Sequence, residues 1–301
     1  MSDKTISYTP IILILLPLVL LSAIFFIPNS NSYLQLNFFS NSCQPAALPP
    51  QHLPKSKPEF KLLIGIITVP EKTERRHIIR MAYELQKPIP HAQIDIRFVF
   101  CQLKTEEQKV FIAMEILRYR DIIILNCTEN MNEGKTYTYF SSVPKMFQGE
   151  EQPYDYVMKA DDDAYFRLDN LFDALRDKPR VDTYWGKGYP PLDQDNPPYL
   201  VGMGYALSWD LVQWIAESDF ARNNTHGIED INLAMWLNVA GKGKNRFNMR
   251  EKMYDFHGVE AKDFPNYTIA VHVLKNDFTW MVTLKNFNVT GGLEPSPFYH
   301  L

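Results

Sequence analysis

The segment Tyr154–Leu168 reads YDYVMKADDDAYFRL. Within it, Tyr156–Ala160 is a short, mostly apolar and β-prone run, which predicts a buried strand. Three carboxylates follow at once, Asp161, Asp162 and Asp163. Ligands of open α/β sheets bind beyond the carboxyl ends of the strands, so acids at this point favour a divalent cation, with Asp161 and Asp163 on one side and Asp162 on the other. A solvated acidic turn is the alternative, because charge clusters usually lie in water.

The bulk composition restricts the classes of partner. The chain has 301 residues, of which 46% are hydrophobic, and a formal net charge of −4. These values are ordinary for a globular protein, and without a dominant basic patch we expect no nucleic-acid partner. The cysteines, Cys43, Cys101 and Cys127, show no CxxC spacing, which argues against a structural zinc site and a dense disulfide framework. At most one disulfide can form.

The N-terminal region carries an apolar run, Ile11–Ile27, which is just long enough for the roughly 30 Å core of a bilayer. The run is long for the hydrophobic region of a cleaved signal peptide, the alternative, and no small-residue cleavage site follows it. We therefore expect one transmembrane signal anchor at 11–27, after a cytosolic tail at 1–10. The Asn-, Ser-, Gln- and Pro-rich composition of residues 28–60 favours a flexible stem.

Beyond the stem, strands alternate with helices up to the three acids. The predicted strands are Lys61–Thr68, Ile94–Cys101 and Asp121–Leu125, and the predicted helices are Glu74–Gln86 and one opened by Thr105, with Gln108 in the capping-box position and Val110, Ala113 and Leu117 at helical spacing. Later elements are a helix at Leu168–Leu175, a strand around Trp185, a loop at Tyr189–Tyr199, a helix capped by Ser208 and a helix at Glu229–Ala240. The alternation predicts an α/β domain at 61–290, with a Rossmann-like, mainly parallel sheet and helices on both faces, and a tail at 291–301.

Several common motifs are absent or incomplete. Gly134–Thr136 reads GKT, but a phosphate-binding loop needs a glycine five positions earlier, where Glu129 stands. No GxSxG or HExxH occurs, which removes the commonest serine hydrolase and metalloprotease signatures. Sequons that a signal anchor would expose to glycosylation lie at Asn126, Asn223, Asn266 and Asn288.

Taken together, the motifs from Ile64 to Leu284 resemble glycosyltransferase family 31, the β-1,3-galactosyl- and N-acetylglucosaminyltransferases. Five motifs stand in the family's order: ERRHIIRMAY (Glu74–Tyr83), KADDDAYFRLDNL (Lys159–Leu171), PPYLVGMGYALSWDLV (Pro197–Val212), IEDINLAMWL (Ile228–Leu237) and IAVHVLK (Ile269–Lys275). The segment ENMNEGKTYTYF (Glu129–Phe140) is most similar to the fungal branch.

The resemblance implies a GT-A fold and an inverting enzyme that uses Mn²⁺ (or Mg²⁺) and a UDP-sugar. It implies transfer of a hexose, galactose or N-acetylglucosamine, to a hydroxyl of a glycan or glycoprotein acceptor in a β-1,3 linkage. It also implies a single-pass type II Golgi membrane protein with its catalytic domain in the lumen. Two other functions stay open: a metal-dependent phosphohydrolase, and a non-catalytic sugar-binding Golgi protein.

Three residues are the expected metal ligands. A diphosphate about 5 Å from a carboxylate costs on the order of 3 kcal/mol per charge pair at an effective dielectric near 20, so a cation must intervene. We expect Asp163 to hold it, with Asp161 on the metal or the ribose, and Asp162 to support the turn beside the nucleotide. One imidazole suits such a cation, and we choose His272 over His257. The alternative for His272 is a packed core residue.

The remaining site residues follow from the resemblance. Asp230 would be the catalytic base; the alternative is that Glu229 and Asp230 only cap their helix. The expected donor-binding residues are Arg76, Arg80, Lys159, Gly202 and Gly204, in which the glycines would let the backbone approach the sugar.

Three departures from the family pattern bear on specificity: Tyr83 replaces a tryptophan, Val201 a cysteine and Met203 a glycine. The lost cysteine implies that a family disulfide is missing. The larger Met203, expected beside the sugar, weakens any transfer of donor specificity from the family.

Overall fold

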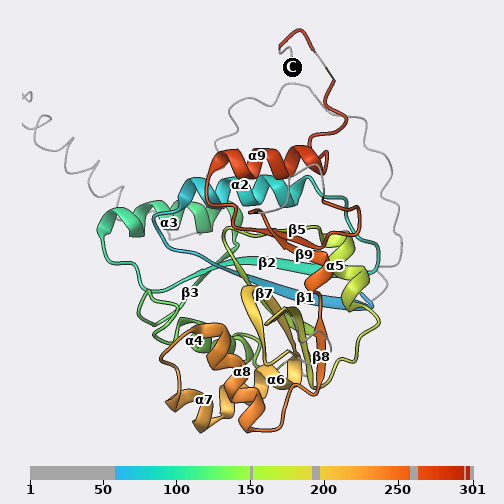
Figure 1. Cartoon of the computed structure of the whole chain (residues 1–301). Coiled ribbons are helices and arrows are strands. Elements are labelled where there is room, and N and C mark those ends of the chain that lie inside the picture. Colours follow the sequence, from blue (N-terminus) through green and yellow to red (C-terminus); the bar gives the residue numbers. More distant parts are fainter. Residues whose placement is uncertain (1–57, 150–151, 192–196, 258–263, 295, 299–301) are drawn as a thin grey trace, which may run out of the picture. The chain divides into compact units, whose positions relative to one another are not determined.

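The computed structural model describes residues 58–149, 152–191, 197–257, 264–294 and 296–298 (Figure 1). These residues lie in one compact unit, Lys55–Leu301. The predicted cytosolic tail, transmembrane anchor and most of the stem fall outside the described residues. Among the described residues, none of the helices combines the length and apolar character that a bilayer crossing requires.

A seven-stranded sheet forms the centre of this unit, in the order β3-β2-β1-β4-β7-β6-β8. Its strands are β1 (Phe60–Ile67), β2 (Ala92–Phe100), β3 (Ile122–Ile124), β4 (Tyr156–Asp161), β6 (Thr183–Tyr189), β7 (Tyr199–Ser208) and β8 (Asn245–Asn248). Strand β1 pairs in parallel with β2 and β4, β2 with β3 and β6 with β8, whereas β7 is antiparallel to β4 and β6. The prediction of a mixed, mainly parallel sheet is therefore confirmed.

Helices cover both faces of the sheet (Figure 1). They are α2 (Thr73–Glu84), α3 (Glu106–Tyr119), α4 (Lys135–Met146), α5 (Leu168–Leu175), α6 (Trp209–Glu217), α7 (Asp219–Asn223), α8 (Glu229–Val239) and α9 (Asp277–Asn286). Side chains of α2, α5 and α9 enter one apolar core, and those of α4, α6, α7 and α8 enter the other. The sheet is thus buried on both sides, as its near-continuous apolar strands require.

A second, three-stranded sheet lies beside the three acids. It consists of β5 (Tyr165–Phe166), β10 (Ala270–His272) and β9 (Met253–Asp255), which follows the 3₁₀ turn Arg250–Lys252. Strand β10 is antiparallel to β5 and parallel to β9. Because β5 follows the acids almost directly, this pairing brings the late part of the chain to them.

Two helices differ from the sequence-based expectation. Helix α4 was not predicted; Gly134 starts it in the left-handed region (φ 89°), and Pro144, which cannot donate to the carbonyl oxygen of Phe140, lies in its last turn, two residues before it ends. Helix α3 and its capping box are confirmed, but its predicted apolar stripe points outward, since Ile112 and Glu115 are its buried residues. Glu115 is buried because its carboxylate forms ion pairs with Arg76 and Arg80 of α2. These ion pairs, and not the apolar spacing, decide which side of α3 faces the protein.

Gly65 on β1 is expected to tolerate no side chain, because a Cβ there would lie 2.3 Å from Cζ of the buried Tyr139 on α4. Gly65→Ala should lower the free energy of unfolding by about 1–3 kcal/mol in denaturant titrations. Gly65→Ala combined with Tyr139→Leu, which removes the ring, should cost less than the sum of the two single variants. Additive costs would show that the two residues do not touch.

Candidate functional site

A cleft of about 230 Å³ opens at the carboxyl ends of β1 and β4, where Ile67 and Asp161 are register partners. It is lined by Ile67, Thr68, Val69, Lys72, Glu129, Met131, Lys135, Asp161, Asp162 and Asp163. The predicted strand-end position of the acids is therefore what the structure shows. A larger, apolar cavity of about 380 Å³ lies between α2 and β2, and none of the three acids lines it.

Asp161, Asp163 and His272 come together at the edge of this cleft, with one ligand atom of each within 4.8 Å of the others. His272 Nε2 lies 3.2 Å from Asp163 Oδ1 and 3.7 Å from Asp161 Oδ2. Two carboxylate oxygens and one imidazole nitrogen suit a divalent cation such as Mn²⁺. The alternative ligand, His257, is exposed and is not part of this group.

The chain around His272 is bent to make this contact. The backbone N–H of Leu274 donates to the carbonyl oxygen of Asp163 at 2.9 Å, which holds the two segments side by side. Between His272 and Leu274, Val273 adopts a φ of 67°, a strained conformation for a β-branched residue. Strain of this kind concentrates at functional sites.

Asp255 was not predicted as a site residue, yet it orients His272. Its Oδ1 lies 2.8 Å from His272 Nδ1, and its Oδ2 accepts a hydrogen bond of 2.6 Å from Lys187. Register pairing of β9 with β10 places the two residues opposite each other. A carboxylate on Nδ1 leaves Nε2 toward the acids, the usual support of a metal-binding histidine. Asp255 follows only a short apolar run, so the sequence offered little signal.

His272, Asp163 and Asp255 shift one another's pKa values. Burial would lower the pKa of His272, but the hydrogen bonds and charges of Asp163 and Asp255 outweigh it and raise that pKa to about 9. Burial likewise opposes ionisation of Asp163, and its hydrogen bond with His272 prevails, so the pKa of Asp163 is lowered. The hydrogen bond with His272 is also the main cause of the lowered pKa of Asp255.

Lys159 is fully buried and links the acids to the start of α8 (Glu229–Val239). Its Nζ lies 2.7 Å from Asp161 Oδ1 and 2.7 Å from Glu229 Oε1. Glu229 Oε2 accepts a hydrogen bond of 2.8 Å from the Tyr205 hydroxyl. Burial disfavours the ammonium, but the charges of Asp161 and Glu229 outweigh it, so the pKa of Lys159 is raised. Lys159 is not among the residues that line the cleft.

Asp230 is half-buried on the first turn of α8. Its Oδ2 accepts a hydrogen bond of 3.0 Å from the N–H of Gly202, and its Oδ1 one of 2.8 Å from the N–H of Ile231. The second bond means that the capping alternative is partly correct for Asp230, although Ile228 occupies the N-cap position. Burial first, and then the charge of Glu229, raise the pKa of Asp230.

Two glycines of β7 lie where other side chains leave no room for a Cβ atom. A Cβ on Gly202 would lie 2.6 Å from Glu229 Oε1, so only glycine fits beside the buried ion pair. A Cβ on Gly204 would lie 2.5 Å from Cζ of Phe166, and Met203 is buried in the same core. Gly204 and Met203 therefore do not face the cleft, contrary to the expectation that they lie beside the sugar.

The two arginines of α2 are not brought to the acids. Arg76 is fully buried, pairs with Glu115 at 2.6 Å and donates to the carbonyl oxygen of Val69 at 2.7 Å. Arg80 pairs with Glu115 and with Asp121. We expected both arginines to contact the nucleotide, but both form ion pairs inside the domain. Arg76 also binds the loop after β1, which lines the cleft.

Asp162 is not part of the metal-type group, although it lines the same cleft. Its carboxylate accepts a hydrogen bond of 2.7 Å from Thr68 Oγ1 and pairs with Lys72 at 2.8 Å. These contacts tie the acidic turn to the loop after β1. Tyr83, which replaces the family tryptophan, is buried, and its hydroxyl accepts a hydrogen bond from the N–H of Phe166 in β5.

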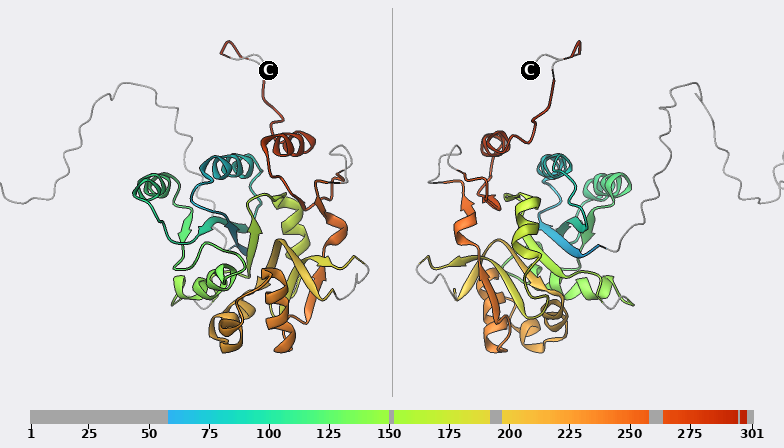
Figure 2. Two further views of the ribbon diagram at one scale, coloured as in Figure 1. Left: turned by 60° about the vertical axis from the view of Figure 1, so that its left-hand side comes forward. Right: turned by 90° about the vertical axis from the view of Figure 1, so that its right-hand side faces the viewer.

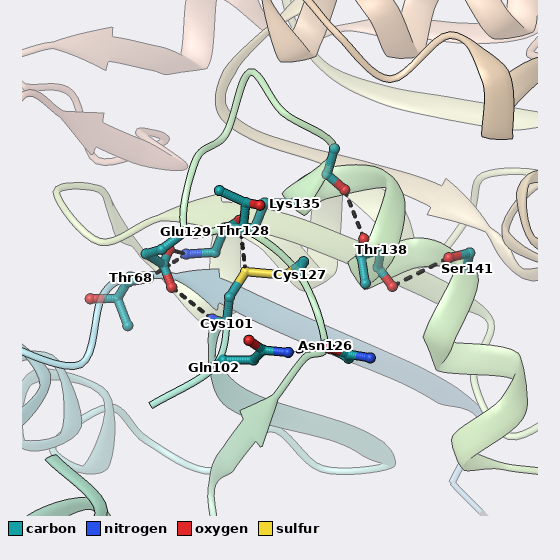
Figure 3. The surroundings of a disulfide bond; sticks show 11 residues. Thr68, Cys101, Gln102, Asn126, Cys127, Thr128, Glu129, Lys135, Thr138 and Ser141 are labelled. Atoms are coloured by element: carbon teal, nitrogen blue, oxygen red, sulfur yellow. Dashed lines mark hydrogen bonds and ion pairs between the residues drawn. A yellow bond between two sulfur atoms is a disulfide. The ribbon is translucent and has the colours of Figure 1, made fainter. Parts of the chain in front are cut away.

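A disulfide joins Cys101 and Cys127, which follow the neighbouring strands β2 and β3, and it is the one bridge that three cysteines allow (Figure 3). The N–H of Cys101 donates to Glu129 at 2.7 Å, and Glu129 pairs with the buried Lys135. Lys135 in turn donates to the carbonyl oxygen of Thr68. The GKT stretch is no phosphate-binding loop, but its lysine helps to form the cleft.

Residues 74–192 match a family model described as Galactosyltransferase. The chain is 25% identical to the β-1,3-galactosyltransferase pvg3 of Schizosaccharomyces pombe, over 72% of each protein. It is 22% identical to UDP-GalNAc:β-1,3-N-acetylgalactosaminyltransferase 2 of Xenopus tropicalis, over 46% of this chain and only 31% of that relative. The galactosyltransferase LgtC, solved with donor and acceptor sugar analogues, overlaps at a TM-score of 0.44 and 13% identity, over 79% of this chain and 98% of that chain.

These matches agree with the resemblance to glycosyltransferase family 31, and a fungal protein is among the relatives. The matched range contains the three acids but ends before Gly202, Asp230 and His272. The overlap with LgtC is too loose to carry an argument about the site.

We predict that Asp255→Asn lowers the pKa of His272 from about 9 toward its ordinary 6.5, because the variant removes a charged hydrogen-bond partner. A metal ion must displace the proton on His272, so the affinity for Mn²⁺ should rise with pH and level off near the pKa of His272. In the variant, the affinity should level off at a lower pH. Imidazole NMR on the metal-free protein and calorimetry with Mn²⁺ measure both effects. Asp169→Asn, at an exposed carboxylate, is the matched control, and wild-type profiles in Asp255→Asn would contradict the assignment.

Proposed function

We propose that this chain, whose residues 74–192 match a galactosyltransferase family model, is a GT-A enzyme that transfers a hexose from a UDP-sugar to a glycan or glycoprotein hydroxyl. The hexose is galactose or N-acetylglucosamine, and the reaction inverts the anomeric carbon to form a β-1,3 linkage in protein glycosylation. One observation carries the proposal: the buried Lys159 joins the Asp161, Asp163 and His272 group to the helix turn that holds Asp230.

The residues at the strand end fit a divalent cation, Mn²⁺ or Mg²⁺. Asp161, Asp163 and His272 would hold it, and Asp255 keeps the free nitrogen of His272 directed at the two acids. When bound, the cation offsets the charge of the diphosphate and stabilises the departing UDP. The cleft beside these ligands, with Thr68 and Lys72 on its wall, would receive the nucleotide.

Asp230 is the proposed base. In an inverting transfer a base on the acceptor side takes the proton of the attacking hydroxyl, while the sugar carbon is attacked from the face opposite UDP. The Gly202 N–H fixes one oxygen of Asp230, and burial raises its pKa, which makes it a better proton acceptor than an exposed aspartate. Lys159 and Arg76 act indirectly: Lys159 through Asp161 and the start of α8, Arg76 through the loop after β1.

We also propose a type II Golgi membrane protein with this domain in the lumen. The apolar run 11–27 supports an anchor. The Cys101–Cys127 disulfide supports an oxidising compartment. The asparagines of the four sequons, Asn126, Asn223, Asn266 and Asn288, are exposed, which supports glycosylation.

Two substitutions should separate metal binding from base catalysis. Asp163→Ala should abolish both Mn²⁺ binding and sugar transfer, because it removes a ligand. Asp230→Asn should keep Mn²⁺ binding but lower kcat by about 10²–10⁴-fold, because it removes the base. A screen of UDP-sugars for UDP release, with and without EDTA and with an acceptor array, measures transfer, and calorimetry measures binding.

The control is Asp219→Asn, an exposed carboxylate on α7, which should behave as wild type. Turnover retained by Asp230→Asn would refute the base. Release of inorganic phosphate without an acceptor would favour a phosphohydrolase, and no turnover with any UDP-sugar would favour a non-catalytic sugar-binding protein.

The topology predicts N-glycans on the full chain when it is expressed in a eukaryotic cell. Treatment with an endoglycosidase should shift the protein to lower mass, and Asn→Gln at the four sequons should remove the shift. The protein should sediment with membranes and be released by detergent. An unmodified chain in the soluble fraction would contradict the lumenal orientation.

A further inference from the structure

Two tyrosines lie at the edge of the seven-stranded sheet from which the three acids leave. Tyr189 ends β6 and Tyr199 begins β7, and the two are register partners in this antiparallel pair of strands. Strand β7 also runs antiparallel to β4, with Gly204 opposite Ala160, so the first residues of β7 lie beyond the carboxyl end of β4. Tyr189 and Tyr199, which we call the tyrosine pair, therefore extend past the same edge of the sheet as the acids.

The two rings form one aromatic surface. Their centroids lie 5.4 Å apart, and the ring planes are tilted by 37°. Tyr189 is 45% exposed, and Tyr199 is partly exposed. The backbone next to the rings is fixed, because the N–H groups of Gly188 and Leu200 donate to side-chain oxygens at 2.8 and 3.1 Å. Rigid aromatic side chains that remain in contact with water are typical of a binding surface.

Along β7 the tyrosine pair is joined to the proposed base. Gly202 follows Tyr199 by three residues, and its N–H donates to Asp230 Oδ2 at 3.0 Å. Burial first, and then the charge of Asp230, raise the pKa of Tyr199. The phenol of Tyr199 and the carboxylate of Asp230 are therefore close enough to interact electrostatically.

Along β6 the pair is joined to the metal-type group. Lys187 precedes Tyr189 by two residues and donates to Asp255, which orients His272. Figure 2 shows α8 and α9 on opposite faces of the large sheet; α8 packs into one core, and the strand of His272 packs with α9 into the other. Asp230 thus comes from one face and His272 from the other, and the tyrosine pair lies at the edge that both faces share.

A sugar suits this surface better than a peptide side chain does. Neither tyrosine is among the residues that line the cleft assigned to the nucleotide, so the pair is available to the second substrate. A hexopyranose presents C–H groups on one face and hydroxyl groups around its rim, and a tyrosine, with an apolar ring and a polar tip, matches both. The hydroxyl of a serine or threonine carries no comparable flat apolar face for a ring to stack on.

We propose that the tyrosine pair is the acceptor platform of this enzyme: a neutral hexopyranose at the end of the acceptor glycan stacks on Tyr189 and Tyr199, with one hydroxyl toward Asp230. The acceptor is then a saccharide and not a serine or threonine side chain. The platform has this role only if the proposed function holds, because Asp230 must take the proton of the acceptor hydroxyl. Tyr189 and Tyr199 hold the acceptor sugar and take no part in the proton transfer.

Acceptor kinetics test the platform. Tyr189→Ala and Tyr199→Ala should each raise the KM for a saccharide acceptor about two- to tenfold, because each removes one aromatic contact, and should leave the KM for the UDP-sugar at the wild-type value. Tyr189→Phe and Tyr199→Phe keep the rings and should restore the wild-type acceptor KM. The matched control is Tyr267→Ala, at a 56% exposed tyrosine outside the pair.

Three kinetic results would overturn the proposal. One is an unchanged acceptor KM in both alanine variants. Another is a rise in the KM for the UDP-sugar in place of the acceptor KM, which would assign the rings to the donor. The third is transfer to a serine or threonine peptide that neither alanine variant affects, which would make a protein side chain the acceptor.

Binding without turnover separates the platform from the proposed function. Saturation-transfer NMR on the full chain with Mn²⁺ and UDP, with the methyl glycosides of galactose, glucose and mannose as probes, should show saturation of the C–H protons on one ring face of at least one glycoside. The double variant Tyr189→Ala/Tyr199→Ala should abolish this signal, and Tyr267→Ala should keep it.

A signal that depends on both tyrosines, in a protein that transfers no sugar, would contradict the proposed function and still support a saccharide site at the tyrosine pair. The absence of a signal for all three glycosides, or a signal that survives the loss of both rings, would overturn the platform.

Discussion

The site depends on one buried ammonium. Lys159 lies on β4 with no exposed surface, and an isolated charge there would be very costly. It is tolerable only because Asp161 and Glu229 both lie 2.7 Å away. The acidic turn and the first turn of α8 are therefore held at a fixed separation, and Asp230, next to Glu229, is held with them.

A second constraint comes from strand pairing. Parallel neighbours end at the same edge of the sheet, which places the loop after β1 beside the acids after β4. The small sheet then adds His272 through β5 and β10, and Asp255 through β9. Three segments that are distant in sequence thus supply one cluster, and the Cys101–Cys127 disulfide ties β2 to β3 beside it.

Local sequence patterns predicted the elements well and their partners poorly. The apolar run before Asp161 and the capping box of Thr105 are local signals, and both elements formed as expected. Asp255 could not be found in this way, because its role depends on the register of β9 against β10. Lys159, Arg76 and Gly204 were assigned to the donor, yet ion pairing and packing turn them inward, which spacing along the chain does not reveal. Helix α3 shows the same limit, since a paired Glu115 took the buried side in place of the apolar residues.

We propose above all that Asp161, Asp163 and His272 coordinate one divalent cation. Pulsed electron paramagnetic resonance on Mn²⁺ bound to the chain with UDP tests it most directly, because it detects nitrogen coupled to the metal. We predict the coupling of one imidazole nitrogen, which His272→Gln removes. A spectrum without nitrogen coupling, or one that His272→Gln leaves unchanged, would contradict the account.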